Sequence, residues 1–334
     1  MRGPPCSDDT PMIAAHADWS VDPRKRWVSI ARRRRKARGG GVEWRAEAPR
    51  PVGDPAALTA GLLAEGVPLA FGLDLPLGLP RGFAATRPEV DFPAFLRGLV
   101  ARPDFFLVSP TLETVSPERP FYPARGIKGM TRLAHATALG LADAAALSRL
   151  CDRATAERPA GAPVFWTLGA NQTGKGAIGA WRDWLAPALA KGAPLALWPF
   201  QGGLHALLAP GRAVLAEVYP AEAMRHLGVT LPGSKRLPHA RRAAAGALGA
   251  AMARLAVRPS AALAQAMEDG FGLDAAGEDR FDSQLGLLCL VAVLDGLRPD
   301  FIPDDPWVRG WEGWVLGQTA LPAGWPTEAM LAAL

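Results

Sequence analysis

Four acidic residues, far apart in the chain, each lie next to or within a strongly apolar segment. They are Asp18 after residues 12–17 (MIAAHA), Asp74 within FGLDLPLGLP, Glu217 within AVLAEVYP, and Asp282 within FDSQLGLLCLVAVL. A carboxylate in such surroundings is costly to bury unless it is paired or binds a cation. Several of them at the ends of core elements predict a site for Mg²⁺ or Mn²⁺, the metals that assist phosphodiester cleavage.

Each acid also has a purely structural interpretation. Asp18 could cap a turn, Asp74 could bond its own backbone in a turn, and Glu217 could pair with a buried arginine. Asp279 and Asp282 are three residues apart on one face of a predicted helix, where both could stabilise the helix dipole. Because Asp282 directly precedes the buried stripe of that helix, we expect Asp282 to bind metal and Asp279 to be auxiliary.

Three basic residues are candidates for binding substrate phosphates. Lys235 and Arg236 follow the Glu217 segment, and Lys175 lies at a predicted helix start, where free amides favour anions. A solvated helix face is the alternative for the first two. Residues 169–175 (GANQTGK) have the spacing of a phosphate-binding loop, but Gly176 stands where Ser or Thr should bind Mg²⁺. A tight turn at a helix start explains this segment more simply.

Composition limits the class of protein. The chain has 334 residues, 49% of them hydrophobic, and a net charge of +5, which allows a large core and mildly favours a polyanionic partner. Three widely spaced cysteines form no zinc motif or disulfide framework, so a reducing cytoplasm is expected. Residues 1–10 are predicted to be a disordered tail without a signal peptide, and the apolar segment 285–294 is too short to cross a membrane. The basic run at 32–38 predicts a solvated hairpin tip, and the scattered histidines do not favour histidine-based catalysis.

The predicted elements alternate between strands and helices. Strands are expected at 12–18, 26–31 and 42–46, a helix at 54–65 and a strand at 67–75. Residues 80–160, rich in proline, predict an insertion of short helices and loops. Beyond it we expect strands at 163–168, 194–200 and 213–219, helices at 175–190, 234–256, 259–268 and 279–296, and a short closing strand at 312–317. The order β-β-β-α-β followed by further mixed elements predicts an α/β protein with one domain over 11–334.

A set of short motifs, in order along nearly the whole chain, resembles the family catalogued as domain of unknown function 429, predicted nucleases with a ribonuclease-H-like fold. The motifs are Asp18-Trp19-Ser20, GLDLPLGLP (72–80), LGANQTGKGAIGAW (168–181), LWPFQG (197–202), EVYPAEAMRHLG (217–228), Ser234-Lys235-Arg236, DRFDSQLG (279–286) and EGWVLG (312–317). The resemblance implies a mixed central sheet whose second strand is antiparallel, with helices on both faces. It also implies that Asp18, Asp74, Glu217 and Asp282 converge at one end of the sheet. Ser283 departs from the family, which often has alanine there, and residues 80–160 fit its pattern only loosely.

Together these observations predict a divalent-metal-dependent nuclease that uses Mg²⁺ or Mn²⁺ and acts on DNA or RNA. Two alternatives stay open. One is a nucleic-acid-binding protein on the same fold without turnover. The other is a nucleotide-binding phosphotransferase, since kinases of the actin type also place an aspartate on the first strand of a related sheet.

Overall fold

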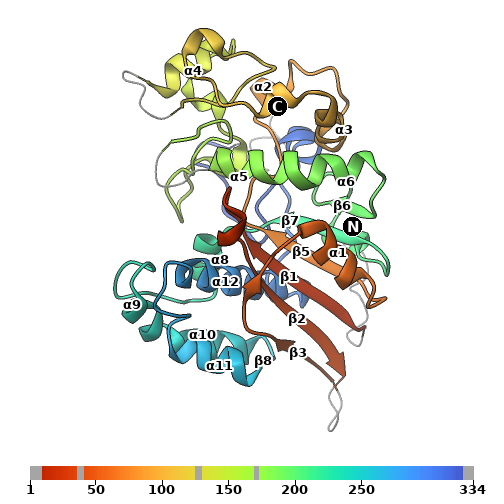
Figure 1. Cartoon of the computed structure of the whole chain (residues 1–334), viewed down its shortest axis with the longest axis vertical. Coiled ribbons are helices and arrows are strands. Elements are labelled where there is room, and N and C mark those ends of the chain that lie inside the picture. The colour runs from red at the N-terminus through yellow and green to blue at the C-terminus, as the bar shows by residue number, and fades with distance from the viewer. Residues whose placement is uncertain (1–9, 36–40, 125–129, 169–172, 326–334) are drawn as a thin grey trace.

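A mixed β-sheet of eight strands forms the centre of the protein, in a computed structural model that describes residues 10–35, 41–124, 130–168 and 173–325 (Figure 1). The strands are β1 (Met12–Asp18), β2 (Trp27–Arg35), β3 (Val42–Ala46), β4 (Arg50–Pro51), β5 (Leu69–Leu73), β6 (Leu195–Leu197), β7 (Ala213–Glu217) and β8 (Val257–Pro259). Their order is β6-β7-β5-β1-β2-β3-β8, and β4 pairs with β2. The chain is therefore an α/β protein with helices around one sheet.

The middle of the sheet is parallel. β1, β5, β7 and β6 run in the same direction, whereas β2 is antiparallel to both β1 and β3. Parallel strands are covered on both faces, which explains why β1, β5 and β7 are buried along their whole length and consist mainly of apolar residues. The carboxyl ends of these three strands meet at one edge of the sheet.

Helices cover both faces of the sheet. On one face, α1 (Pro55–Leu63), α5 (Thr173–Ala180) and α6 (Ala186–Ala190) pack in a core with Ile13, Ala15 and Ala17 of β1. On the other, α8 (Pro220–His226), α10 (Ala245–Arg254) and α12 (Gly277–Leu294) pack in a core with Met12 and Ala14. The smaller helices α7 (Leu204–Leu207), α9 (Pro238–Ala243) and α11 (Ala261–Glu268) lie around this frame.

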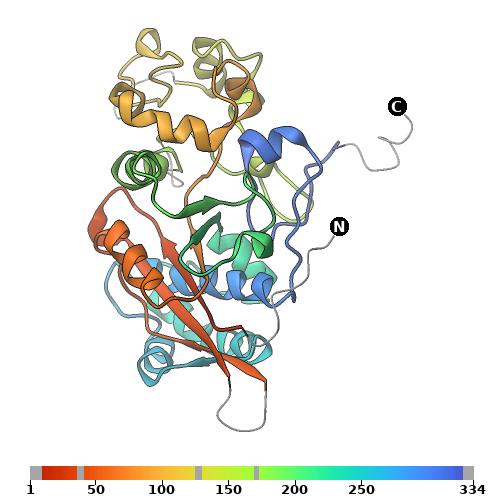
Figure 2. The same ribbon diagram turned by 90° about the vertical axis from the view of Figure 1, so that its right-hand side faces the viewer.

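The predicted insertion lies beyond the carboxyl ends of the parallel strands, at the top of Figures 1 and 2. It contains α2 (Arg81–Ala84), α3 (Phe92–Gly98), α4 (Arg132–Ala138) and several 3-10 turns. An aromatic cluster forms its interior, with Phe105 in edge contact with Phe95, Phe121 and Phe165. The insertion is thus a packed layer that covers one end of the sheet.

Most predicted elements are present, but three of the predictions differ from the structure and a few elements were not predicted. The expected strand at 163–168 is wrong: Trp166 makes a single bridge to Tyr122, and the apolar side chains fill the aromatic cluster instead. The closing strand at 312–317 is reduced to one bridge between Val315 and Glu217. The helix at 234–256 is two helices, α9 and α10, and the first begins only at Pro238, because proline suits a first helical turn. The strands β4 and β8 and the helices α7 and α8 were not predicted.

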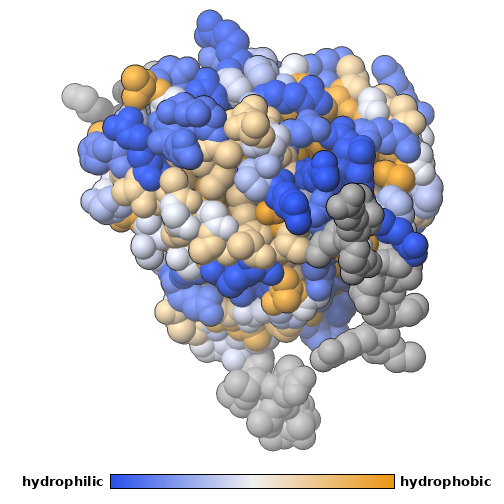
Figure 3. All heavy atoms as spheres, turned by 90° about the horizontal axis from the view of Figure 1, so that it is seen from below, coloured by the Kyte–Doolittle hydropathy of each residue, from blue (hydrophilic) through white to orange (hydrophobic). Residues whose placement is uncertain are grey.

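Part of the basic run at 32–38 is structural. Arg32 pairs with Glu47 and Glu65, and Arg33 pairs with Asp295. Residues 36–40 and the predicted tail, apart from Thr10, lie outside the described residues. Within the described ranges, no helix has the length and apolarity needed to cross a membrane. On the face seen from below, hydrophilic residues are interspersed with weakly apolar ones (Figure 3).

Candidate active site

Asp18 and Asp74 lie together at the carboxyl ends of β1 and β5. The parallel register pairs Ala17 with Leu73, and the backbone amide of Asp74 donates to the carbonyl oxygen of Ala17 over 3.0 Å. The two acids therefore occupy equivalent positions on neighbouring strands. Asp18 is 8% exposed, so a small part of it reaches the surface at this edge.

Helix α12 brings Asp282 to the same place. Burial lowers the pKa of His16 to about 4, so its imidazole is neutral, and its Nδ1 lies 3.1 Å from the carbonyl oxygen of Ser283. The ring fits because position 286 is glycine: a Cβ on Gly286 would lie 2.1 Å from an imidazole atom. His16 is on the same face of β1 as Asp18, and Ser283 adjoins Asp282. This contact therefore fixes the helix carboxylate beside the strand carboxylate.

The two oxygens of Asp282 differ in their environment. Lys235, in the turn before α9, donates from its ammonium group to Oδ2 of Asp282 and lies 3.6 Å from Oε1 of Glu278. Oδ1 of Asp282 is buried and has no hydrogen-bond partner among the residues that the structure describes. A buried charged oxygen without a partner is unfavourable, so this atom is suited to bind a cation.

The carboxyl groups repel one another. Burial, followed by the charges of Asp282 and Asp74, raises the pKa of Asp18 well above its usual range. Burial and then the charge of Asp282 raise the pKa of Asp74 to about 7, although a hydrogen bond with Asp18 opposes the shift. Burial also raises the pKa of Asp282, against the effect of Lys235, and burial with Asp282 raises that of Asp279 to about 6. At neutral pH this set of neighbouring carboxyl groups must therefore share protons or bind cations.

Glu217 lies at the same edge but on the opposite face of the sheet. The register of β5 and β7 pairs Glu217 with Leu73, the residue before Asp74. Successive residues of a strand point to opposite faces, so Glu217 points away from the face of Asp18. Its charge still contributes to the raised pKa of Asp74, but its position on the other face does not support the prediction that Glu217 binds metal together with the three aspartates.

A buried arginine occupies both oxygens of Glu217. Arg149 donates to Oε2 and Oε1 over 2.6 and 2.7 Å, and the amide of Leu77 donates to Oε2 over 2.7 Å. Arg149 also binds both oxygens of Asp152, and the hydroxyl of Tyr219 lies 3.1 Å from each of these two residues. A buried arginine was one of the predicted partners of Glu217, but no sequence pattern singled out Arg149. This network joins the insertion to the end of β7.

A pocket of about 650 Å³ opens over the aspartates. Its walls come from the end of β1, the first turn of α5, the start of α8 and residues 158–162 of the insertion. Asp18, Asp74, Glu222 and Asp279 contribute acidic groups, and the basic groups are those of Lys25, Arg158, Lys175, Arg225 and Lys235. The pocket thus has acidic groups at one end and basic groups along its walls. This arrangement suits a ligand that carries phosphate and binds together with a metal cation.

The three predicted phosphate-binding residues differ in their positions. Lys235 and Lys175 line the pocket. Arg236 does not line it: its side chain is 74% exposed and its Nε lies 3.6 Å from Glu278. Residues 169–172 of the loop before α5 lie outside the described residues.

Comparison with known proteins assigns no family. No family model, curated protein or solved structure matches the chain. The resemblance to domain of unknown function 429 therefore stays a prediction from the motifs.

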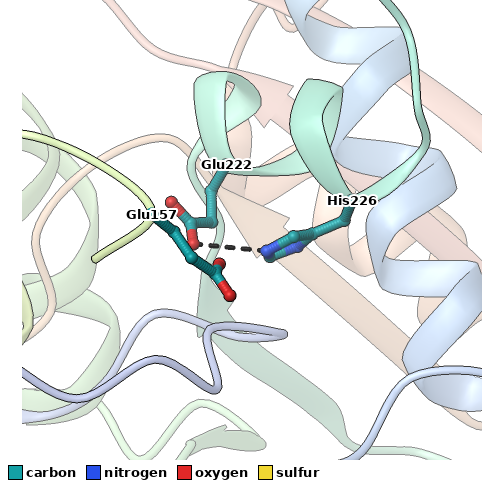
Figure 4. Close-up of side chains that lie close together, drawn as sticks. All are labelled: Glu157, Glu222 and His226. Atoms are coloured by element: carbon teal, nitrogen blue, oxygen red, sulfur yellow. Dashed lines mark ion pairs between the residues drawn. The ribbon is translucent and has the colours of Figure 1, made fainter. Parts of the chain in front are cut away.

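A second cluster is formed by Glu157, Glu222 and His226 (Figure 4), of which Glu222 lines the pocket. Among the described residues, it is the one group of three acidic, histidine or cysteine side chains whose ligand atoms all lie within 4.8 Å of one another. Glu222, however, already pairs with the guanidinium groups of Arg158 and Arg225. These guanidinium groups already neutralise the carboxylate that a metal would need as a ligand. The cluster therefore fits an ion-pair network better than a metal site.

The aspartates are more widely spaced than this second cluster. Among the described residues, no three of these carboxyl groups bring their oxygens within 4.8 Å of one another. The aspartates therefore do not form a closed set of ligands around a single point in this structure.

Proposed function

We propose that the protein is a divalent-metal-dependent hydrolase of phosphodiesters, with nucleic acid as its substrate. The observation that carries the proposal is the group formed by Asp18, Asp74 and Asp282, whose repelling carboxyl groups include a buried oxygen without a partner. The strand order β3-β2-β1-β5-β7, with β2 antiparallel, supports a ribonuclease-H-like arrangement of the core. In such an arrangement the acids lie at the carboxyl ends of the strands.

The chemistry of these side chains fits Mg²⁺ or Mn²⁺. All three candidate ligands are carboxylates, and hard cations of this kind prefer oxygen ligands. Bound there, the metal would activate water and stabilise the leaving oxygen. Asp18, Asp74 and Asp282 would hold it, and Glu217 would hold the strand end through Arg149.

The remaining pocket residues would bind and orient the substrate. Lys235 and Lys175 can donate to phosphate oxygens, and a lysine binds phosphate as a compact point charge. Asp279 lines the same pocket with a pKa of about 6, so it can accept a proton near neutral pH. The pocket of about 650 Å³ leaves room for such a phosphate beside these side chains.

Cleavage assays on purified variants test the proposal. Labelled single- and double-stranded DNA and RNA would be incubated with Mg²⁺, Mn²⁺ or EDTA. We expect metal-dependent cleavage that is lost in Asp18→Asn and Asp282→Asn and kept in Asp104→Asn, an exposed control. Circular dichroism would establish that each variant is folded. Unchanged cleavage in both site variants would refute the assignment.

One observation favours a second candidate, a nucleic-acid-binding protein without turnover. Lys235 already neutralises part of Asp282, and the basic pocket residues could hold phosphates without a metal. Salt-sensitive binding with no cleavage under any divalent metal would select this function.

A further inference from the structure

Lys235 occupies one of the two places at which a cation could bind Asp282. Its ammonium group donates to Oδ2, while Oδ1 remains without a partner. Glu278 lies 3.6 Å from the same ammonium and helps to hold it. In the absence of metal, this lysine is therefore the positive charge that reduces the repulsion within the acidic group.

The two members of this ion pair differ in freedom. Asp282 is buried on α12, and the contact of His16 with Ser283 fixes the helix against β1. Lys235 lies in the turn between α8 and α9, with 36% of its side chain exposed, and it lines the pocket. Its four-carbon side chain can turn without a change in the backbone. If the pair separates, the lysine is the partner that moves.

We propose that Lys235 is an internal counter-ion, which divalent metal displaces from Asp282 and which then binds a phosphate oxygen of the substrate in the same pocket. The inference rests on the proposed function, because it assumes that metal binds at the aspartates. A divalent ion beside Oδ1 would repel the ammonium from Oδ2. Glu278, 3.6 Å from the ammonium, keeps the released lysine at the pocket wall, where a substrate phosphate becomes a further anionic partner.

Two consequences follow from this exchange. Lysine and metal compete for Asp282, so a neutral residue at 235 strengthens metal binding in the absence of substrate. Once metal is bound, the ammonium group of Lys235 attracts the substrate phosphate. A neutral residue at 235 therefore weakens substrate binding. A purely structural lysine would not produce these opposite effects.

The test measures Mn²⁺ affinity by electron paramagnetic resonance of the free ion. Lys235→Met is expected to bind Mn²⁺ about tenfold more tightly than the unmodified protein, because one competing unit charge is removed. Lys235→Arg keeps the charge and should return the affinity close to the original value. Lys191→Met removes an exposed lysine elsewhere and controls for net charge. Lys235→Gln is a second neutral variant, in case the methionine variant does not fold.

Substrate binding is measured with a fluorescent phosphorothioate oligothymidylate, which resists cleavage, at saturating Mn²⁺. Lys235→Met should weaken this binding about tenfold, and Lys235→Arg should restore most of it. Equal or weaker Mn²⁺ binding in Lys235→Met, or unchanged oligonucleotide binding, would overturn the inference while the proposed function stands. If Asp18→Asn binds Mn²⁺ as tightly as the unmodified protein does, or if neither protein binds Mn²⁺, both the inference and the proposed function would be overturned.

Discussion

Replacing Asp74 by asparagine should stabilise the protein at alkaline pH in the absence of metal. Asp74 has an ordinary pKa of 3.8, and burial with the charge of Asp282 raises it to about 7 in the folded state. Between these values the folded state keeps a proton that the unfolded state has lost. The free energy of unfolding therefore falls as the pH rises from about 4 through 7, and asparagine, which does not ionise, removes this loss.

The size of the effect follows from the same two values. A difference of about 3 in pKa, at about 1.4 kcal/mol for each unit, corresponds to about 4 kcal/mol at pH 8. This is an upper limit, because Asp74 borders the pocket, where water screens its charge. We expect Asp74→Asn to gain most of its advantage between pH 5 and 8, about 2–4 kcal/mol over the unmodified protein, and little below pH 4.

Urea unfolding followed by circular dichroism, at several pH values with EDTA, measures this difference. Asp104→Asn, an exposed control, should follow the pH profile of the unmodified protein. Adding Mg²⁺ at pH 8 should stabilise the unmodified protein and have a smaller effect on Asp74→Asn. If Asp74→Asn is the less stable protein at pH 8 without metal, repulsion between the carboxyl groups does not destabilise the folded state.

Two further substitutions test the packing that positions the site. Arg149→Met should lower the free energy of unfolding by about 3–5 kcal/mol, since it leaves buried carboxylates unpaired. Urea unfolding measures this change. Arg24→Met, which removes an exposed ion pair, is the control and should leave the urea midpoint unchanged. An equal midpoint for both variants would contradict the network. Gly286→Ala should cost about 1–3 kcal/mol by displacing the ring of His16, whereas Gly310→Ala, where a Cβ meets no atom within 4 Å, should cost much less. In His16→Ala the additional effect of Gly286→Ala should largely disappear, and full additivity would show that the ring is not the obstacle.

The sequence allowed the central strands and the three aspartates of the candidate site to be predicted. Buried parallel strands are nearly continuous apolar segments, so β1, β5 and β7 were recognisable, and an acid after each of the first two had to lie at the sheet edge. Asp282 was also predictable, because the apolar stripe of α12 fixes the direction in which its first turns face the sheet.

The face on which Glu217 lies could not be predicted. It depends on the register between β5 and β7, and a shift of one residue reverses every side chain. Arg149 lies 68 residues before Glu217 in an insertion without a clear pattern, so no local signal joined the two. Phe165 shows a related difficulty: an apolar segment is buried equally well in an aromatic cluster or in a strand.

A crystal soaked in Mn²⁺, with anomalous scattering recorded near the manganese edge, tests metal binding most directly. We predict one or two peaks about 2.0–2.3 Å from carboxylate oxygens of Asp18, Asp74 and Asp282, with Lys235 turned away from Asp282. No peak among these oxygens, or a peak only at Glu157, Glu222 and His226, would contradict the account.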